Sequence, residues 1–135
     1  MISGGAGFIG SHFVDRLIQE KPSQITVVDN LFLGNLDNLN DAKKAFPKLK
    51  VVTRDLTVMD IIQDLFARGD ARIDVVVDFA TIPLPAAYAY PEYTFLNNVK
   101  IVMNFCELLR KGLFELYVHC SSSEALGTCL QDSGM

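Results

Sequence analysis

The stretch SGGAGFIGSH, residues 3–12, holds four of the chain's nine glycines. Gly4, Gly7 and Gly10 have the spacing G-x-x-G-x-x-G and stand between the first apolar residues and an amphipathic helical pattern. In such a turn, one glycine permits the tight bend, one lets the backbone approach a pyrophosphate, and one lets helix and strand pack closely. The N-terminus of the helix then offers N–H groups to phosphate. A glycine-rich surface turn is the alternative interpretation.

An acidic residue follows at the distance that a dinucleotide site needs. The β-branched run QITVVDN (24–30) carries Asp29 near its end, 19 residues after Gly10. A carboxylate there accepts hydrogen bonds from both ribose hydroxyls of an adenosine and repels a 2′-phosphate, so the pattern favours NAD over NADP. A helix cap or a loop charge is the alternative for Asp29.

The rest of the chain alternates between strand and helix patterns. Continuous apolar runs predict strands covered on both faces over 24–30, 49–55, 73–80 and 115–123. Residues 38–46 predict a short helix, and a long helix is expected to begin near Pro91. Helical spacing predicts three inward faces, formed by Ile9, Phe13, Val14, Leu17 and Ile18, by Val58, Ile61, Ile62, Leu65 and Phe66, and by Phe95, Val99, Val102, Cys106 and Leu109. The pattern predicts an α/β doubly wound parallel sheet, a Rossmann fold, incomplete at both ends.

Composition is that of one globular domain of 135 residues, half of them hydrophobic and 21% charged. The net charge is −4 and no basic stripe is present, which argues against a nucleic-acid partner. No apolar run is long enough to cross a membrane and no leader pattern precedes the glycines. Three cysteines without paired spacing indicate reduced thiols in a cytoplasmic protein, and two distant histidines argue against a metal site.

With these motifs in place, the sequence resembles the extended short-chain dehydrogenases/reductases, in their nucleotide-sugar epimerase, dehydratase and decarboxylase branch. The resemblance covers essentially all 135 residues. It implies NAD as cofactor, with Asp29 and Asn30 holding the adenosine ribose and with Asp55 and Leu56, in RDLT (54–57), flanking adenine. The full set of cofactor-binding residues that it implies is Gly4, Gly7, Phe8, Ile9, Gly10, Asp29, Asn30, Asp55, Leu56, Phe79, Ala80 and Asn98.

The same resemblance implies catalytic residues in CSSSEALG (120–127). Ser122 falls where the family has its catalytic hydroxyl, and Glu124 falls where dehydratases and decarboxylases carry a glutamate. A solvated strand end with capping hydroxyls is the alternative for the serines. The chain departs from the family pattern at several positions, where it has Asp78, Phe79, Ile101, Val102 and Leu126.

The implied reaction is transient oxidation of a sugar hydroxyl on a nucleotide sugar, assisted by a tyrosine and a lysine in the motif Tyr-x-x-x-Lys. None of the four tyrosines is followed by lysine four residues on. Only two or three residues precede Gly4, although a first strand usually has about five. We therefore expect residues 1–135 to be the cofactor-binding, N-terminal part of a longer enzyme, or a sequence with residues omitted. Such a part would lack the C-terminal substrate-binding region and would not turn over alone.

The resemblance also implies a homodimer for the full-length enzyme, paired through the long helix over 95–109. Two other functions remain open from the sequence. The first is a non-catalytic NAD-binding protein of regulatory or scaffold type, which the departures from the family pattern favour. The second is a reductase that acts on a small carbonyl compound and consumes its cofactor. Glu124 favours elimination or decarboxylation over simple epimerisation, because a carboxylate beside the hydroxyl can act as acid or base.

Overall fold

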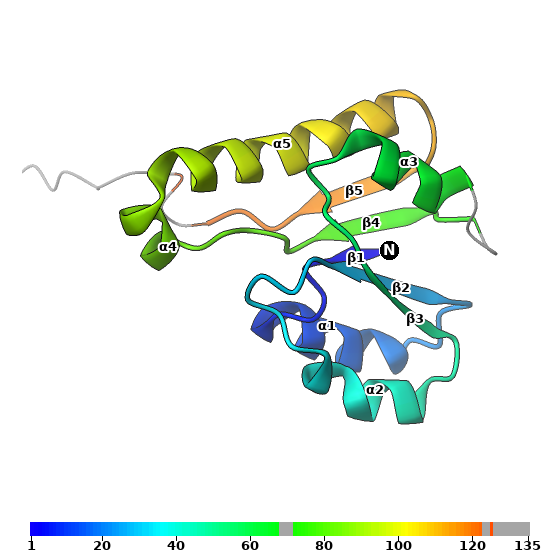
Figure 1. The fold of residues 1–135 in the computed structure, drawn as a ribbon. Helices are drawn as coiled ribbons and strands as arrows, with labels where there is room; N and C mark the ends of the chain where they lie inside the picture. Colours follow the sequence, from blue (N-terminus) through cyan, green and yellow to red (C-terminus); the bar gives the residue numbers. More distant parts are fainter. Residues whose placement is uncertain (68–71, 123–124, 126–135) are drawn as a thin grey trace, which may run out of the picture.

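The computed structural model describes residues 1–67, 72–122 and 125, which are built around one parallel sheet of strand order β3-β2-β1-β4-β5 (Figure 1). The predicted strands are found in the expected places, each somewhat shorter than its apolar run. Their bounds are β1 Ile2–Ser3, β2 Ile25–Asp29, β3 Leu49–Thr53, β4 Val75–Asp78 and β5 Leu116–His119.

The short strand β1 lies at the centre of the sheet. Ile2 pairs with Val27 of β2 on one side and with Val77 of β4 on the other. The Val77 N–H donates to the Met1 carbonyl at 2.9 Å. Both residues of β1 are buried. The strand order therefore reverses between β1 and β4, which is where open α/β sheets bind their ligands.

Helices cover both faces of the sheet, as a doubly wound fold requires (Figure 1). On one face, α1 (Phe8–Ile18), the 3₁₀ helix η1 (Leu36–Leu39) and α2 (Asn40–Ala45) pack on β1 and β2. On the other face, α3 (Met59–Ala67) and α5 (Pro91–Arg110) enclose the second half of the core. The short α4 (Leu84–Ala89) leads directly into α5. The expected fold class and the expected short helix near residue 40 are both confirmed.

The predicted inward face of the long helix is wrong for Phe95, Val99 and Cys106, because α5 is rotated about its axis relative to the prediction, whereas Leu109 packs against the core as expected. Phe95 is 66% exposed, and Val99 and Cys106 are exposed as well. The face of α5 that packs on the sheet and on α3 is instead formed by Thr94, Ile101, Asn104, Phe105 and Leu108. Two of these residues are polar, which is why the apolar spacing alone selected the neighbouring face.

The first helix differs from its prediction at one position. Val14 is buried and Phe13, Leu17 and Ile18 pack against the core as expected. Ile9 is 60% exposed, because it stands in the first turn of α1 at the edge of the sheet rather than over it. Its side chain borders a cavity at that edge.

Candidate functional site

The glycine turn that joins β1 to α1 contains two glycines that the fold itself requires. Gly4 has φ +62°, and a Cβ there would lie 2.7 Å from the backbone nitrogen of Ala80. A Cβ on Gly10 would lie 2.7 Å from the Cα of Gly5. A Cβ on Gly7 would meet only the Gly4 carbonyl oxygen, at 3.2 Å. The turn is therefore packed most closely at Gly4 and Gly10, whereas Gly7 has a single close neighbour and borders a surface cavity that also reaches Asp29.

The N-terminus of α1 opens toward that cavity. Its N-cap is Gly7, and within the described residues no side chain caps the helix. The first N–H groups of a helix have no partner inside the helix and need one from elsewhere. Together with the partial positive charge of the helix terminus, these groups can donate to a phosphate. Phe8 and Ile9, the first two residues of α1, are themselves exposed.

The side chain of Asp29 ties the glycine turn to the end of β2. It is 7% exposed; its Oδ2 accepts from the Ala6 N–H at 2.9 Å, and its Oδ1 accepts from the Leu31 N–H at 2.8 Å. Each oxygen of an ionised carboxylate can accept a second hydrogen bond. Asp29 can therefore hold the turn and still accept from a ligand hydroxyl.

Asn38 is a further residue of the turn that the sequence analysis did not single out. Its Nδ2 donates to the Ala6 carbonyl at 2.8 Å, and the Asn35 N–H donates to the same oxygen at 3.0 Å. The backbone of Ala6 is thereby held from both sides, by Asp29 and by the η1 segment. The asparagine-rich sequence GNLDNLN (34–40) is the signal that could have indicated it.

Two cavities lie at the carboxyl ends of the strands and share Phe79, Ala80 and Thr81 as lining. The first has a volume of about 100 Å³, and the second has a volume of about 610 Å³. Only the second falls within the range of roughly 300–1,000 Å³ that is typical of small-molecule sites. The first is bordered by the predicted cofactor residues Gly4, Gly7, Asp29, Asn30, Leu56, Phe79 and Ala80. The second is bordered by Ile9, Phe79, Ala80, Asn98 and Ser122.

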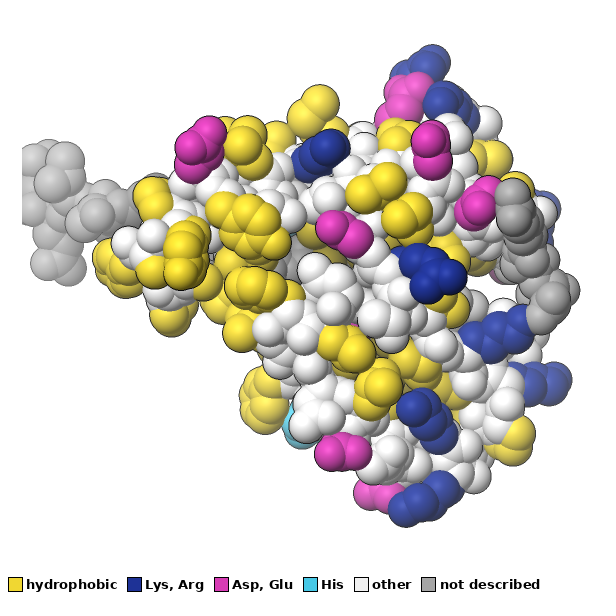
Figure 2. Space-filling view, in the orientation of Figure 1, with side chains coloured by type: hydrophobic (Ala, Val, Ile, Leu, Met, Phe, Trp, Pro, Cys, Tyr) yellow, Lys and Arg dark blue, Asp and Glu magenta, His cyan; other side chains and the backbone are white. Residues whose placement is uncertain are grey.

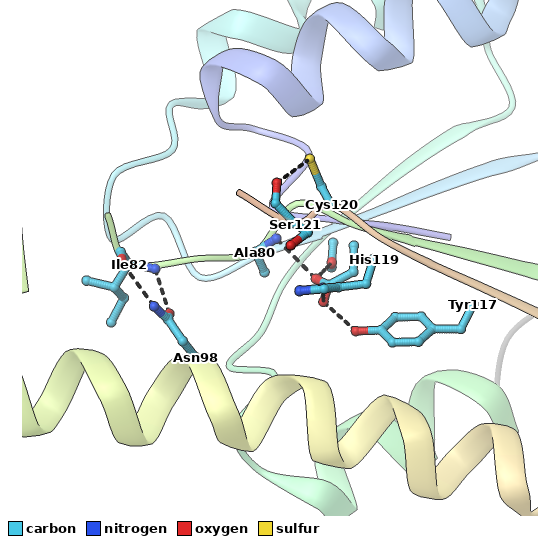
Figure 3. Close-up of polar contacts among 9 residues, drawn as sticks. Ala80, Ile82, Asn98, Tyr117, His119, Cys120 and Ser121 are labelled. Carbon is cyan, nitrogen blue, oxygen red and sulfur yellow. Dashed lines mark hydrogen bonds and ion pairs between the residues drawn. The ribbon is translucent and has the colours of Figure 1, made fainter. Parts of the chain in front are cut away.

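Asparagines of α5 hold two of the loops that border these cavities. The Ile82 N–H donates to the Asn98 Oδ1 at 2.8 Å, and the Asn98 Nδ2 donates back to the Ile82 carbonyl at 3.0 Å (Figure 3). Asn104, which the sequence analysis passed over, donates to the Leu56 carbonyl at 2.9 Å. The expected role of Asn98 as a bridge between backbone and site has this geometric basis.

A buried carboxylate, Asp78 at the end of β4, is the centre of a second polar network. Its Oδ1 accepts from the Ser3 hydroxyl and from the Ala80 N–H, the latter at 3.1 Å. Its Oδ2 accepts from the Tyr117 hydroxyl at 2.6 Å and lies 3.1 Å from the Nδ1 of His119. Figure 3 shows Tyr117 and His119 projecting from the same strand, β5. The network joins β1, β4 and β5 beside the larger cavity.

This network removes Tyr117 as a candidate base. Burial raises its pKa well above the usual value, and the hydrogen bond to Asp78 raises the pKa further. Tyr117 therefore keeps its proton at neutral pH, and its hydroxyl donates a hydrogen bond to the Asp78 carboxylate. This agrees with the interpretation that Tyr117 does not take the place of a catalytic tyrosine.

Four predicted site residues line neither cavity or lie outside the described residues. Gly10 is one of them, because it packs against the backbone of Gly4 and Gly5 behind the turn. Asp55 is exposed and its Oδ1 accepts from the Thr57 N–H and hydroxyl, both at 2.8 Å, and it lines neither cavity. Phe8 lines neither cavity and packs its ring on His12. Glu124, like Leu126 and Gly127, lies outside the described residues.

Two kinds of feature are absent from the part of the chain that the structure describes. Over residues 1–67, 72–122 and 125, no helix is both long and apolar enough to cross a membrane. In the same residues, no group of three or more histidine, cysteine, aspartate or glutamate side chains could hold a metal ion.

Several known proteins that are similar to this chain are named as epimerases or decarboxylases of UDP-sugars. UDP-glucuronic acid decarboxylase 5 of Arabidopsis thaliana is 34% identical over 114 residues, covering 82% of this chain and 30% of that protein. The putative UDP-glucose 4-epimerase of Methanocaldococcus jannaschii is 33% identical over 127 residues, covering 93% of this chain and 38% of that protein. The chain thus spans only about a third of the length of these relatives.

A solved structure shows the same arrangement of elements. The UDP-glucose 4-epimerase of Bifidobacterium longum, in complex with NAD⁺ and UDP, superposes with a TM-score of 0.80 at 25% identity, covering 94% of this chain and 38% of that one. The NAD dependent epimerase/dehydratase family model matches residues 1–134. The chain therefore belongs to the NAD-dependent epimerase/dehydratase family.

Proposed function

We propose that the chain binds NAD across the carboxyl edge of its sheet. The observation that carries the proposal is the uncapped helix terminus beside Gly7, in one cavity with the Asp29 carboxylate. The main chain from Gly4 to Gly10, with Phe8 and Ile9, would cradle the pyrophosphate, and Asp29 with Asn30 would hold the adenosine ribose. Leu56 would form an apolar wall for adenine, with Asp55 near its exocyclic amine. Phe79, Ala80 and Asn98 would border the rest of the cofactor.

The full-length protein, on this proposal, modifies a nucleotide sugar as an epimerase, dehydratase or decarboxylase. The bound cofactor would supply reversible acceptance of a hydride from a sugar carbon. Ser122, on the wall of the larger cavity, would orient the reacting hydroxyl, and Glu124 would serve as acid or base. Support comes from the names of the relatives, which cover all three reactions.

Removal of the proton from the sugar hydroxyl needs the tyrosine of a Tyr-x-x-x-Lys motif, which residues 1–135 do not supply. None of the four tyrosines begins a Tyr-x-x-x-Lys motif, and Tyr117 is held protonated. We therefore expect the 135-residue chain to bind NAD and to leave nucleotide sugars unchanged. The purified chain, incubated with NAD and a panel of nucleotide sugars, should give no product by chromatography. Formation of a product would show that the 135-residue chain contains a sufficient base and would contradict this expectation.

The alternative function is that of an NAD-binding protein without catalysis. The replacements at Asp78 and Leu126 favour it, because both positions differ from the family pattern. The polypeptide encoded by the complete gene separates the two functions. Conversion of a nucleotide sugar supports the enzyme, and the product identifies epimerisation, dehydration or decarboxylation. NAD binding without conversion of any sugar would support the regulatory or scaffold protein instead.

Dimerisation of the full-length protein through α5 completes the proposal. Figure 2 shows hydrophobic side chains gathered over α4 and the first half of α5. The exposed apolar residues on α5 are Tyr93, Phe95, Leu96, Val99 and Met103. Light scattering of the full-length protein should give the mass of a dimer, and Val99→Glu together with Met103→Glu should shift it to a monomer. A wild-type monomer at micromolar concentration would contradict the proposal.

A further inference from the structure

The network around Asp78 fixes the hydrogen-bonding state of His119. Three groups besides the histidine face the carboxylate, and all three donate: the Ser3 hydroxyl, the Ala80 N–H and the Tyr117 hydroxyl. With these three donors, Asp78 is the acceptor in each of these hydrogen bonds. The fourth contact, at 3.1 Å, therefore requires a proton on the His119 Nδ1.

A neutral histidine with its proton on Nδ1 has a lone pair on Nε2. The Nδ1 edge of the ring is turned toward Asp78, so the Nε2 edge is turned away from that carboxylate. The His119 side chain is 42% exposed and borders the larger cavity, together with Ser122. The buried carboxylate thus holds a hydrogen-bond acceptor on the wall of the cavity where the sugar is expected.

We propose that His119 is a substrate-contacting residue, whose Nε2 accepts a hydrogen bond from a hydroxyl group of a sugar bound in the larger cavity. Asp78 is then a positioning residue, which acts through the Nδ1 of His119 without touching the sugar. The inference rests on the proposed function, because it takes the sugar part of a nucleotide sugar as the ligand. It adds a recognition group that neither the glycine turn nor Ser122 supplies.

The ring nitrogens of His119 can be observed directly by ¹⁵N NMR of the histidine-labelled 135-residue chain. The chain has two histidines, and His12 is an internal control, since its Nδ1 lies 2.8 Å from the Phe8 carbonyl, which can only accept. The Nδ1 of both rings should therefore carry a proton. The variant Asp78→Asn should change the tautomer ratio of His119 alone. A wild-type His119 with its proton on Nε2 would overturn the inference without any variant.

Ligand titrations of the histidine-labelled full-length protein, which includes the expected C-terminal substrate-binding region, test the contact; the His119→Phe variant identifies the His119 signals. UDP-glucose should shift the Nε2 resonance of His119, whereas UDP, which lacks the hexose, should leave it in place. His119→Phe should weaken UDP-glucose binding about threefold to tenfold, the size of one neutral hydrogen bond. His119→Gln, which keeps an acceptor oxygen, should recover part of that loss. An unmoved Nε2 resonance at millimolar UDP-glucose would overturn the inference.

A separate titration with NAD distinguishes this inference from the proposed function. If the wild-type chain does not bind NAD, the proposed function is contradicted. The His119 resonances can still be interpreted in that case. If NAD binds normally but UDP-glucose does not shift the Nε2 resonance of His119, only the proposed role of His119 is overturned. In both histidine variants NAD should still bind, because His119 does not border the smaller cavity, where the adenosine ribose is expected.

Discussion

The Asp29 carboxylate and the backbone N–H of Ala6 lie 2.9 Å apart, so the last residue of β2 holds the glycine turn in place. The same carboxylate accepts from Leu31 and borders the smaller cavity. One buried side chain thus has a structural role in the turn and a proposed role in cofactor binding. Any variant of Asp29 has to be measured for stability as well as for binding.

Asp29→Asn should destabilise the chain by about 1–3 kcal/mol, because the amide nitrogen of asparagine faces one of the two N–H groups and leaves it unpaired. Asn30→Ala is the matched control. The Asn30 Oδ1 accepts from the Phe32 N–H in an exposed loop. The Asn30→Ala substitution should therefore lower the free energy of unfolding by less than about 1 kcal/mol. Urea unfolding compares the two. Equal losses would contradict the structural role of Asp29.

Substitutions of two glycines should separate folding from binding. Gly4→Ala should destabilise by more than about 2 kcal/mol, since it adds a Cβ at positive φ and within 2.7 Å of Ala80. Gly7→Ala should leave stability within about 1 kcal/mol of wild type, yet weaken NAD binding about tenfold or more by filling the cradle. Thermal unfolding and calorimetric titration measure the two effects. A Gly7→Ala chain that binds NAD as wild type does would place the pyrophosphate elsewhere.

Asn98→Ala should cost about 1–3 kcal/mol, because it removes both hydrogen bonds to the backbone of the buried Ile82. The neighbouring Asn97→Ala provides the comparison. Asn97 bonds only to a carbonyl one turn earlier in its own helix, at Tyr93, so its loss should cost less than about 0.5 kcal/mol. If urea denaturation showed a larger loss for Asn97→Ala than for Asn98→Ala, the two hydrogen bonds between Asn98 and Ile82 would not be what holds the loop at Ile82.

The sequence predicted the fold because the fold is encoded locally. The β-branched runs and the glycine spacing each lie within a few residues, and they identified every strand and the turn between β1 and α1. The network of Asp78 could not be found in the same way. Its partners Ser3 and Tyr117 lie 75 and 39 residues away, and only the pairing of β1, β4 and β5 brings them together.

The rotation of α5 shows the same limit. Asn104 is buried because it bonds to the Leu56 carbonyl, 48 residues earlier in the chain. No periodicity of apolar residues contains that information, so the apolar pattern favoured the exposed stripe through Phe95 and Val99. Gly4, Gly7, Gly10 and Asp29 were predicted from their spacing, and the family resemblance implied the other proposed cofactor residues.

The corrected orientation of α5 predicts opposite results for two phenylalanines. Phe105 is completely buried, and Phe105→Ala should destabilise by about 3–5 kcal/mol through lost burial and a cavity. Phe95 is mostly exposed, and Phe95→Ala should change stability by less than about 0.5 kcal/mol. Both are measured by urea unfolding of the 135-residue chain. A large loss at Phe95 with little at Phe105 would restore the face predicted from the apolar spacing.

Calorimetric titration of the 135-residue chain with NAD and with NADP tests the central claim most directly. The Asp29 carboxylate should accept from the ribose hydroxyls of NAD and repel the 2′-phosphate of NADP, so NAD should bind at least about tenfold more tightly. Asp29→Asn should reduce that preference. Equal affinity for the two dinucleotides, or no heat of binding with NAD, would contradict the account.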